Sequence, residues 1–414
     1  MNKILKKTIL KGDVSIPPSK SDTQRALICA ALSTGISVIY NIGKSDDEKS
    51  MLKNIRILGA EIEYISENTL KIKGIEKIPE FLEFNVGESG LGLRLLGGLC
   101  ATQKGIHHIY GKGSLINRDQ SFFEKYLTKY GIEISSNSGK VPLVFKGYIN
   151  KDQIEVEGSL SSQYISGLLI GLSLSNSIKE ITVNNINSIP YINMTINTMR
   201  EFGINIENKS HKIFKINSSQ NFKSCEYHVE SDWSSASFWL VAAAIGHDIR
   251  ICGLDHKSKQ ADIYLLEALK LAGCNINYNI DSYSIDALDL KSFNFDATHC
   301  PDLFPALVVL ASKCNGKSQI KGVSRLLNKE SNRANVIKDE FGKIGVDIEL
   351  DGDNMIVIGN SILSSAVVDS KNDHRIAMSL AIIGTTIEGG IEIQNAEAVT
   401  KSYPGFWNDL EQVS

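Results

Sequence analysis

Apolar and polar residues follow a pattern along this chain that recurs at a nearly constant spacing. Five times a helical run ends in an apolar residue, then a glycine, then alternating apolar residues; the glycines are Gly59, Gly131, Gly203, Gly273 and Gly345. Neighbouring glycines of this set are 70 or 72 residues apart. Glycine readily takes the left-handed conformation that ends a helix, and a period of two is typical of a strand. The pattern therefore predicts helix–Gly–strand units repeated through the chain.

A second set of segments repeats with a similar spacing. These six runs each open on a polar residue or glycine and continue with mostly apolar residues; they begin near Ser19, Gly87, Ser161, Asp232, Asp302 and Asp373. Ser, Asp and Gly are favoured at helix starts, and a helix that is apolar round most of its circumference is buried. We therefore expect six α/β units of about 70 residues, each containing one buried helix.

The repeats also predict how the chain divides into domains. Six units fill the 414 residues, and the natural division lies between the third and fourth, near Val229–Ser231. The sixth unit lacks a closing strand, while the segment Thr8–Ile16 is a strand without a unit, so we expect it to join the C-terminal half. The prediction is an α/β fold of two domains with three repeats each: residues 19–229, and residues 1–18 together with 230–414.

Composition and charge narrow the class of protein. The chain has 44 Lys and Arg against 47 Asp and Glu, a formal net charge of −3, which disfavours a nucleic-acid partner. The longest apolar stretch, residues 238–245, is far shorter than the roughly 20 residues of a membrane span. The seven cysteines are odd in number and show no C-x-x-C spacing, and the first residues lack the apolar core of a signal peptide. We expect a cytoplasmic protein without a membrane partner.

The chemistry is concentrated at the starts of the predicted helices. Lys20 and Arg25 lie at the start of the first, Arg94 in the second and Arg375 in the sixth. The N-terminus of a helix favours anions, so cations at this position oppose helix stability, and such violations often mark functional sites. A single Lys or Arg is usually a solvated surface charge, but its recurrence at one repeated position favours a cleft that binds several negative charges, provided the helix starts converge.

Other motifs are absent or carry less weight. Near the fifth repeat, Lys329 and Glu330 would pair an anion ligand with an acid–base carboxylate if they lie at a helix start. There is no phosphate loop of the form G-x-x-x-x-G-K-[ST], no G-x-G-x-x-G, no G-x-S-x-G and no H-E-x-x-H spacing. These absences disfavour a nucleotide kinase, a Rossmann dehydrogenase, a serine hydrolase and a zinc enzyme.

Nine segments, in order and over nearly the whole chain, resemble the motifs of the 5-enolpyruvylshikimate-3-phosphate synthase family: SIPPSKSDTQRAL, GESGLGLRLL, SSQYISGLL, SIPYINMT, DWSSASFWLVAAA, PDLFPAL, NKESNR, DHRIAMSLA and TKSYPGFW. The resemblance implies two inside-out α/β domains of three repeats. It also implies transfer of the enolpyruvyl group of phosphoenolpyruvate to the 5-hydroxyl of shikimate 3-phosphate, with release of phosphate. It implies no metal or organic cofactor, and we expect a monomer.

The resemblance also implies site residues. Asp302 would bind the shikimate hydroxyls and accept a proton, Glu330 would share in proton transfer, and Lys20 would contact both substrates. The residues implied for shikimate 3-phosphate, mainly in the N-terminal domain, are Lys20, Ser21, Arg25, Ser161, Ser162, Gln163, Ser188, Tyr191, Asp302, Arg325 and Lys329. Those implied for phosphoenolpyruvate are Lys20, Gly90, Arg94, Arg118, Gln163, Arg333, Arg375 and Lys401.

The chain departs from the family pattern at several positions. Glu88 and Leu91 replace the usual Asn and Thr of the second helix start, and Gln24 replaces an Asn of the first. Asp119 follows Arg118 where Pro is usual, and Arg325 stands where Asn is usual. Glu88 adds a negative charge beside an expected anion site unless it points away or pairs with a cation.

Two other functions remain as alternatives. The related UDP-N-acetylglucosamine enolpyruvyl transferase shares the fold but uses a cysteine on a mobile loop, and the corresponding stretch Gly105–Gln120 contains none. A non-catalytic six-repeat scaffold that binds anions would be expected to lose some of the charged motif residues. Eight of them are all present: Lys20, Arg25, Arg118, Asp302, Glu330, Arg333, Arg375 and Lys401.

Overall fold

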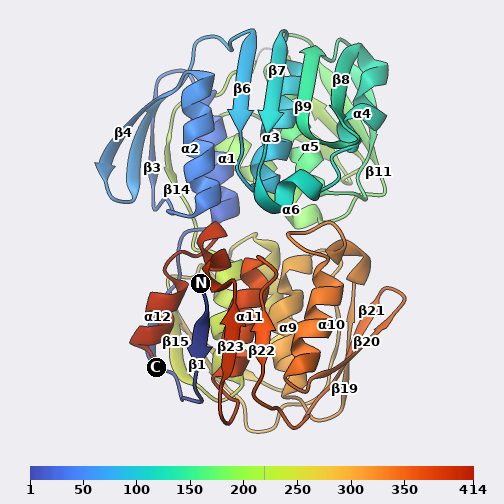
Figure 1. The fold of residues 1–414 in the computed structure, drawn as a ribbon. Helices are drawn as coiled ribbons and strands as arrows, with labels where there is room; N and C mark the ends of the chain where they lie inside the picture. Colours follow the sequence, from blue (N-terminus) through green and yellow to red (C-terminus); the bar gives the residue numbers. More distant parts are fainter. Residues whose placement is uncertain (219) are drawn as a thin grey trace. The chain divides into compact units, whose positions relative to one another are not determined.

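The computed structural model describes residues 1–218 and 220–414 of the chain (Figure 1). The chain forms two compact units. The N-terminal unit is Pro18–Glu230, and the C-terminal unit is Met1–Pro17 together with Ser231–Ser414. Each unit contains three α/β repeats.

The N-terminal unit repeats the order buried helix, strand, outer helix, two strands. Its elements are α1 (Lys20–Ala31), β3 (Ile36–Tyr40), α2 (Asp46–Leu58), β4 (Glu61–Ser66), β5 (Thr69–Lys73), β6 (Phe81–Asn85), α3 (Gly90–Thr102), β7 (Ile106–Tyr110), η1 (Gly113–Asn117), α4 (Phe122–Leu127), η2 (Thr128–Tyr130), β8 (Ile132–Asn137), β9 (Lys140–Gly147), β10 (Gln153–Glu157), α5 (Ser162–Leu172), β11 (Lys179–Asn184), α6 (Ile189–Glu201), β12 (Ile206–Lys209), β13 (Ile213–Ile216) and β14 (Glu226–His228).

The C-terminal unit has the same order, except that no strands follow α12 among the described residues of its third repeat. Its elements are β1 (Lys3–Leu5), β2 (Lys11–Ser15), α7 (Trp233–Ala244), β15 (Asp248–Cys252), η3 (Ala261–Tyr264), α8 (Leu265–Leu271), β16 (Asn275–Asn279), β17 (Ser282–Asp286), β18 (Asn294–Asp296), η4 (Pro301–Leu303), α9 (Phe304–Ser312), β19 (Lys317–Lys321), η5 (Val323–Leu326), α10 (Arg333–Lys343), β20 (Asp347–Asp351), β21 (Asn354–Ile358), β22 (Val367–Asp369), α11 (His374–Gly384), β23 (Ile391–Gln394), η6 (Ala396–Lys401) and α12 (Phe406–Gln412).

Each repeat builds its own small sheet. The strand orders are β14-β3-β5-β4, β6-β7-β9-β8 and β10-β11-β13-β12 in the N-terminal unit, and β2-β15-β17-β16, β18-β19-β21-β20 and β1-β23-β22 in the C-terminal unit. In the second repeat, for example, β6 and β7 are parallel, and β9 is antiparallel to both β7 and β8. The parallel pair needs a crossover, and the buried helix supplies it.

One helix of each repeat is buried along most of its length. These helices are α1, α3 and α5 in the N-terminal unit and α7, α9 and α11 in the C-terminal unit. Their residues are apolar round most of the circumference, so no face is left for solvent. The sheets cover them; in Figure 1 the sheet of β6 to β9 lies across α3 and α5. The predicted fold of buried helices and outer sheets is confirmed.

The repeated glycines have the conformation that the spacing predicts. Gly59, Gly131, Gly203, Gly273 and Gly345 have φ values between +84° and +115°, which is left-handed backbone. Each stands where an outer helix ends and the next strand begins, because glycine pays no steric penalty there.

Strands from the ends of each unit's sequence complete sheets within that unit. β2, from the first residues, pairs in parallel with β15, and β14 pairs in parallel with β3. β1 pairs with β23 and completes the sheet of the sixth repeat. The segment Thr8–Ile16, from which we expected one strand in the C-terminal half, forms the single strand β2, paired with β15 of that unit; β1 is an additional strand before it.

Two helix starts differ from the sequence expectation. The second buried helix begins at Gly90 with Ser89 as its N-cap, because Gly87 has φ +61° and cannot belong to a right-handed helix. Asp302 lies in the 3₁₀ turn η4, one turn before α9. The remaining starts have side-chain caps as expected, for example Ser19 accepting from the amide of Asp22.

Two further expectations concern the whole chain. Over residues 1–218 and 220–414, none of the helices combines the length and hydrophobicity that crossing a bilayer requires. All seven cysteines lie in the described part of the chain and are free thiols; five are buried, while Cys225 and Cys252 are partly exposed.

Candidate functional site

A network of charged side chains in the C-terminal unit is centred on Asp302. Its members come from the starts of successive helices: Asp302 from η4, Lys329 and Glu330 from the turn before α10, Arg333 from the first residue of α10, and Arg375 from the second residue of α11. We call these five residues the Asp302 cluster. Five residues predicted from the sequence, up to 73 positions apart, therefore lie in one place.

The carboxylate of Asp302 accepts hydrogen bonds from three cations. Its Oδ1 accepts from Lys329 Nζ at 3.1 Å and from Arg333 Nη1 at 2.9 Å. Its Oδ2 accepts from Arg375 Nη2 at 3.1 Å. The side chain of Asp302 is 19% exposed, so one side of the carboxylate remains accessible to solvent.

Arg333 connects Asp302 to a second acid–base candidate. Its fully buried guanidinium donates from Nη2 to Glu330 Oε2 at 2.6 Å and from Nε to Asp373 Oδ2 at 2.9 Å. Asp373 is the N-cap of α11 and was expected only as a helix start. The signal for its second role is physical: a buried arginine needs carboxylate partners. With Asp373 included, three cations face three carboxylates, so the cations are already paired.

Burial and charge act in opposite directions on these groups. Burial alone would raise the pKa of Asp302, but its three cationic partners outweigh this and hold that pKa well below its usual range. Burial lowers the pKa of Lys329, although Asp302 partly opposes the shift. For Arg333, the carboxylates of Asp373, Glu330 and Asp302 overcome burial and raise its pKa. At neutral pH Asp302 is ionised, and Lys329 loses its proton more readily than an exposed lysine does.

Two residues behind Arg375 were not predicted. Arg375 Nη1 donates to the hydroxyl of Ser234 on α7. Asp262, in η3, is also buried, and burial raises its pKa to about 7 against the opposing charge of Arg375. The sequence offers no local sign of this, since Asp262 lies in an ordinary polar stretch.

The other two predicted residues of this unit, Lys401 and Arg325, lie outside the Asp302 cluster, in the 3₁₀ turns η6 and η5. Lys401, at the end of η6, is buried and donates from Nζ to the carbonyl of Asn372 at 2.8 Å, next to the start of α11. Arg325 lies in η5, where its amide donates to the carbonyl of Gly322 at 3.0 Å. Its side chain is half-buried.

The predicted residues of the N-terminal unit lie at the starts of α1, α3, α5 and α6 and after η1. We call them the helix-start cluster: Lys20, Ser21, Arg25, Gly90, Arg94, Arg118, Ser161, Ser162, Gln163, Ser188 and Tyr191. Among them, Arg94 Nη1 donates to Gln163 Oε1 at 2.6 Å, and the Arg94 guanidinium lies 5.0 Å from the ring centre of Tyr164. Ser161 is the N-cap of α5, its hydroxyl accepting from the amide of Gln163 at 3.3 Å.

Arg25 is almost completely buried and joins α1 to α6. Its Nε donates to Thr195 Oγ1 at 2.7 Å, and its Nη2 donates to the carbonyl of Tyr191 at 3.3 Å. Its Nη1 donates to the carbonyl of Ser21 at 2.7 Å. Burial lowers the pKa of Arg25 to about 10, which still leaves it charged at neutral pH. Ser188 is the N-cap position of α6, with φ +54°.

Of the remaining cations of this cluster, Lys20 lies beside a carboxylate and Arg118 lies beside a glycine. Lys20 Nζ lies 3.0 Å from Asp47 Oδ2, and both side chains are mostly buried. Asp47, in the first turn of α2, was not predicted. The guanidinium of Arg118 lies over the start of α3: a Cβ on Gly90 would be 2.8 Å from Arg118 Nη1. A side chain at position 90 would therefore displace the Arg118 guanidinium.

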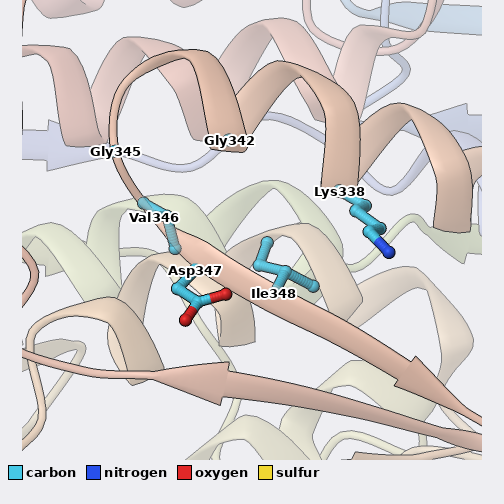
Figure 2. A pocket seen from close by; sticks show the side chains of 6 residues that line it. All are labelled: Lys338, Gly342, Gly345, Val346, Asp347 and Ile348. Carbon is cyan, nitrogen blue, oxygen red and sulfur yellow. The ribbon is translucent and has the colours of Figure 1, made fainter.

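A separate surface hollow lies between the end of α10 and the start of β20 (Figure 2). Its volume is about 380 Å³, and it is lined by Lys338, Gly342, Gly345, Val346, Asp347 and Ile348. Figure 2 shows Ile348 between the charged side chains of Lys338 and Asp347. Both charges are exposed, and the lining contains none of the predicted site residues.

Known proteins resemble this chain over its whole length. The sequence model of the family described as EPSP synthase (3-phosphoshikimate 1-carboxyvinyltransferase) matches residues 4–410. A 3-phosphoshikimate 1-carboxyvinyltransferase of Clostridium novyi is 36% identical, covering 98% of this chain and 95% of the relative. One from Clostridium acetobutylicum is 38% identical with the same coverage.

Solved structures share the fold. An EPSP synthase of Acinetobacter baumannii superposes with a TM-score of 0.80 at 24% identity, covering 100% of this chain and 98% of that one. The enolpyruvyl transferase NikO of Streptomyces tendae gives a TM-score of 0.79 at 14% identity, covering 100% and 97%. Fold alone does not separate these two; the family match and the relatives' identity do. The chain therefore belongs to the EPSP synthase family, whose reaction is transfer of the enolpyruvyl group of phosphoenolpyruvate to shikimate 3-phosphate in the shikimate pathway.

Proposed function

We propose that this enolpyruvyl transfer uses the helix-start cluster mainly to bind shikimate 3-phosphate and the Asp302 cluster mainly for acid–base chemistry. The observation that carries the proposal is the Asp302 carboxylate, which is ionised, partly accessible and hydrogen-bonded to three cations. A buried set of paired charges of this kind is costly to build and is typical of an active site.

Shikimate 3-phosphate carries a phosphate and a carboxylate, and the helix-start cluster provides donors for both. The helix N-terminus at the start of α5, with Ser161, Ser162 and Gln163, suits a phosphate. Lys20, Ser21, Arg25, Ser188 and Tyr191 complete the proposed set from α1 and α6. Asp302, Lys329 and Arg325 are the proposed contacts from the C-terminal unit.

Phosphoenolpyruvate carries the second pair of anionic groups. The proposed residues are Lys20, Gly90, Arg94, Arg118, Gln163, Arg333, Arg375 and Lys401. Two unit charges about 4 Å apart interact by roughly 1 kcal/mol in water and roughly 4 kcal/mol at an effective dielectric of 20. Excluding water therefore strengthens each contact between an arginine and an anionic oxygen of the substrate.

The proposed chemistry is addition followed by elimination. In the addition step, the 5-hydroxyl oxygen bonds to C2 of phosphoenolpyruvate, the hydroxyl loses its proton, and the methylene carbon gains a proton. In elimination, the bond from C2 to the phosphate oxygen breaks and the new methyl group loses a proton. Asp302 accepts the hydroxyl proton, and Glu330 shares in the transfers at the carbon. Lys20 is the third proposed catalytic residue.

A phosphate-release assay with both substrates tests this division of roles. We expect Lys20→Met, Asp302→Ala and Glu330→Ala each to lower kcat by at least about 100-fold, because each removes a positioned charge or proton carrier. Circular dichroism checks that the variants fold. Wild-type turnover in Asp302→Ala would remove Asp302 from the mechanism. Replacing shikimate 3-phosphate by UDP-N-acetylglucosamine gives no phosphate release if the acceptor is assigned correctly.

We also propose that the chain acts as a monomer in the cytoplasm. Every residue that the motifs assign to the two clusters is present in this one sequence, which is compatible with a monomer. Seven free thiols fit a reducing compartment. Sedimentation velocity at assay concentration tests the first point, and a larger species that dissociates with loss of activity would contradict it.

A further inference from the structure

Glu88 lies two residues before α3, where the chain departs from the family motif. Its carboxylate oxygen Oε2 accepts two hydrogen bonds from one residue, the amide and the hydroxyl of Ser114, each at 2.9 Å. Ser114 belongs to η1, the turn that leads to Arg118. Glu88 therefore ties the start of α3 to the turn that carries a proposed phosphoenolpyruvate ligand.

The contact between Glu88 and η1 is close. Gly113 has φ +56°, and a Cβ there would lie 2.2–2.6 Å from the carboxyl atoms of Glu88. The amide of Lys112 donates to the carbonyl of Gly87 at 2.8 Å. The turn is thus held against residues 87–88 by backbone and side-chain bonds, and only glycine at 113 lets the carboxylate approach.

The far end of the same turn sets the position of Arg118. Leu115 is fully buried, and its carbonyl accepts from the amide of Arg118 at 3.1 Å. The Arg118 guanidinium lies directly over Gly90, the first residue of α3. Glu88 and Gly90 flank the N-cap Ser89, so the turn contacts the helix start at both ends.

We infer that Glu88 is a positioning residue, which holds η1 so that Arg118 lies over the N-terminus of α3. The inference rests on the proposed function in one respect, the assignment of Arg118 to phosphoenolpyruvate. The Oε2 of Glu88, although it stands near the proposed anion site, is directed at Ser114. Glu88 fixes the geometry of the site through these hydrogen bonds.

Steady-state kinetics with each substrate varied tests this role. We expect Glu88→Ala to raise KM for phosphoenolpyruvate by about tenfold, with kcat and KM for shikimate 3-phosphate changed less than about threefold. Both bonds end on one oxygen, so the carbonyl oxygen of Glu88→Gln can accept both, and this variant should restore KM to within about threefold of wild type. Glu83→Ala, an exposed carboxylate on β6, is the matched control and should leave all three constants unchanged.

Arg118→Lys separates this inference from the proposed function. If it leaves KM for phosphoenolpyruvate unchanged, the assignment of Arg118 fails, whatever Glu88 does. If Arg118→Lys raises KM for phosphoenolpyruvate while Glu88→Ala does not, the assignment of Arg118 stands and only the positioning role of Glu88 is wrong.

A double variant distinguishes positioning from general destabilisation. Glu88→Ala combined with Arg118→Lys should raise KM no further than Arg118→Lys alone, because Glu88 acts through Arg118. If the increase in KM of the double variant equals the product of the increases in the two single variants, the inference is overturned. If Glu88→Ala does not fold, the same cycle with Ser114→Ala, which removes one of the two bonds, decides the question in the same way.

Discussion

Asp302 shows how strongly a single carboxyl group depends on its partners. Its neighbours Lys329, Arg333 and Arg375 are 27 to 73 positions away in sequence, yet each donates to it within 3.1 Å. Burial opposes ionisation, and the cations reverse that preference. The charge of Asp302 is thus part of both the proposed chemistry and the stability of the C-terminal unit.

Asp302→Asn keeps the shape of the side chain and removes its charge. A carboxyl group whose pKa is lower in the folded chain stabilises the fold above its unfolded pKa of about 3.9 and loses this stabilisation as the pH falls toward the folded pKa. We expect the variant to be less stable than wild type by about 3 kcal/mol at neutral pH, since three mostly buried cations each lose one charged partner. Urea denaturation should show this difference shrinking below about pH 4. A difference that does not depend on pH would contradict the shift.

Asp22, buried at the start of α1, should respond to pH with the opposite sign. It accepts from Tyr227 Oη at 2.7 Å and from the amide of Glu230 at 3.2 Å, yet burial outweighs these bonds and the charge of Arg25 and raises its pKa to about 6. The folded chain then binds a proton more tightly than the unfolded chain, so stability falls as the pH rises from about 4 through about 6.

Asp22→Asn removes this titration. The unfolding free energy of wild type minus that of Asp22→Asn should therefore decrease between about pH 4 and pH 7, as measured by urea denaturation at several pH values. A difference that grows with pH would show that the pKa of Asp22 is lowered by its partners.

Sequence reasoning found the charged motif residues but not all of their partners. Each motif residue stands in a recognisable local context, such as a polar helix start before an apolar run. Asp47 and Asp262 lie outside the six polar helix starts, and Ser234 lies in the fourth start without a charge that would single it out. Their roles arise only when Lys20 and Arg375 are buried beside them.

At the scale of elements, α3 and α5 cross through glycines. A Cβ on Gly98 would lie 2.1 Å from the backbone of Gly167, so the two helices touch backbone to backbone. One turn earlier on each helix, Arg94 donates to Gln163 at 2.6 Å. The close crossing therefore sets the distance across which two proposed substrate ligands meet.

Gly98→Ala should separate the helices. A backbone clash cannot be relieved by a side-chain rotation, so we expect a loss of at least about 2 kcal/mol in unfolding free energy and a higher KM for shikimate 3-phosphate or phosphoenolpyruvate. Gly342→Ala in α10 is the matched control, because nothing lies within 4 Å of its Cβ position. It should stabilise the chain by about 0.5–1 kcal/mol and leave kinetics unchanged. Equal effects of the two substitutions would contradict the packing argument.

Helix types and order were predictable, whereas two starts were not. The apolar circumference of the six runs identified the buried helices, because that signal is local. The start of α3 depends on the left-handed conformation of Gly87, and Asp302 lies in a 3₁₀ turn. Both depend on contacts that the apolar pattern does not contain.

At the scale of the whole molecule, strands that are distant in sequence complete one sheet in each of the two units. β2 completes a sheet that otherwise consists of β15, β16 and β17. β14 completes the sheet of the first repeat in the same way. The chain passes between the units at residues 17–18 and 230–231.

Hydrogen exchange read by mass spectrometry should show which unit binds the acceptor. Most proposed ligands of shikimate 3-phosphate lie in the N-terminal unit, so this substrate alone should slow exchange mainly at the starts of α1, α5 and α6. Shikimate without its phosphate is the control and should protect α5 less. Protection confined to the C-terminal unit would reverse the proposed division.

The order of residues alone determined the six repeats, the buried helices, the closing glycines and the motif residues. Each of these is visible in the sequence as a short motif or as a spacing of 2, 3.6 or about 70 residues. Tertiary structure decided the partners of the charged side chains: Asp47 for Lys20, Asp373 for Arg333 and the hydroxyl of Ser114 for Glu88. It also decided how each carboxyl group titrates. The physical reason is that ion pairing and burial depend on distances between residues far apart in the chain, and these distances exist only once the helices and sheets have packed.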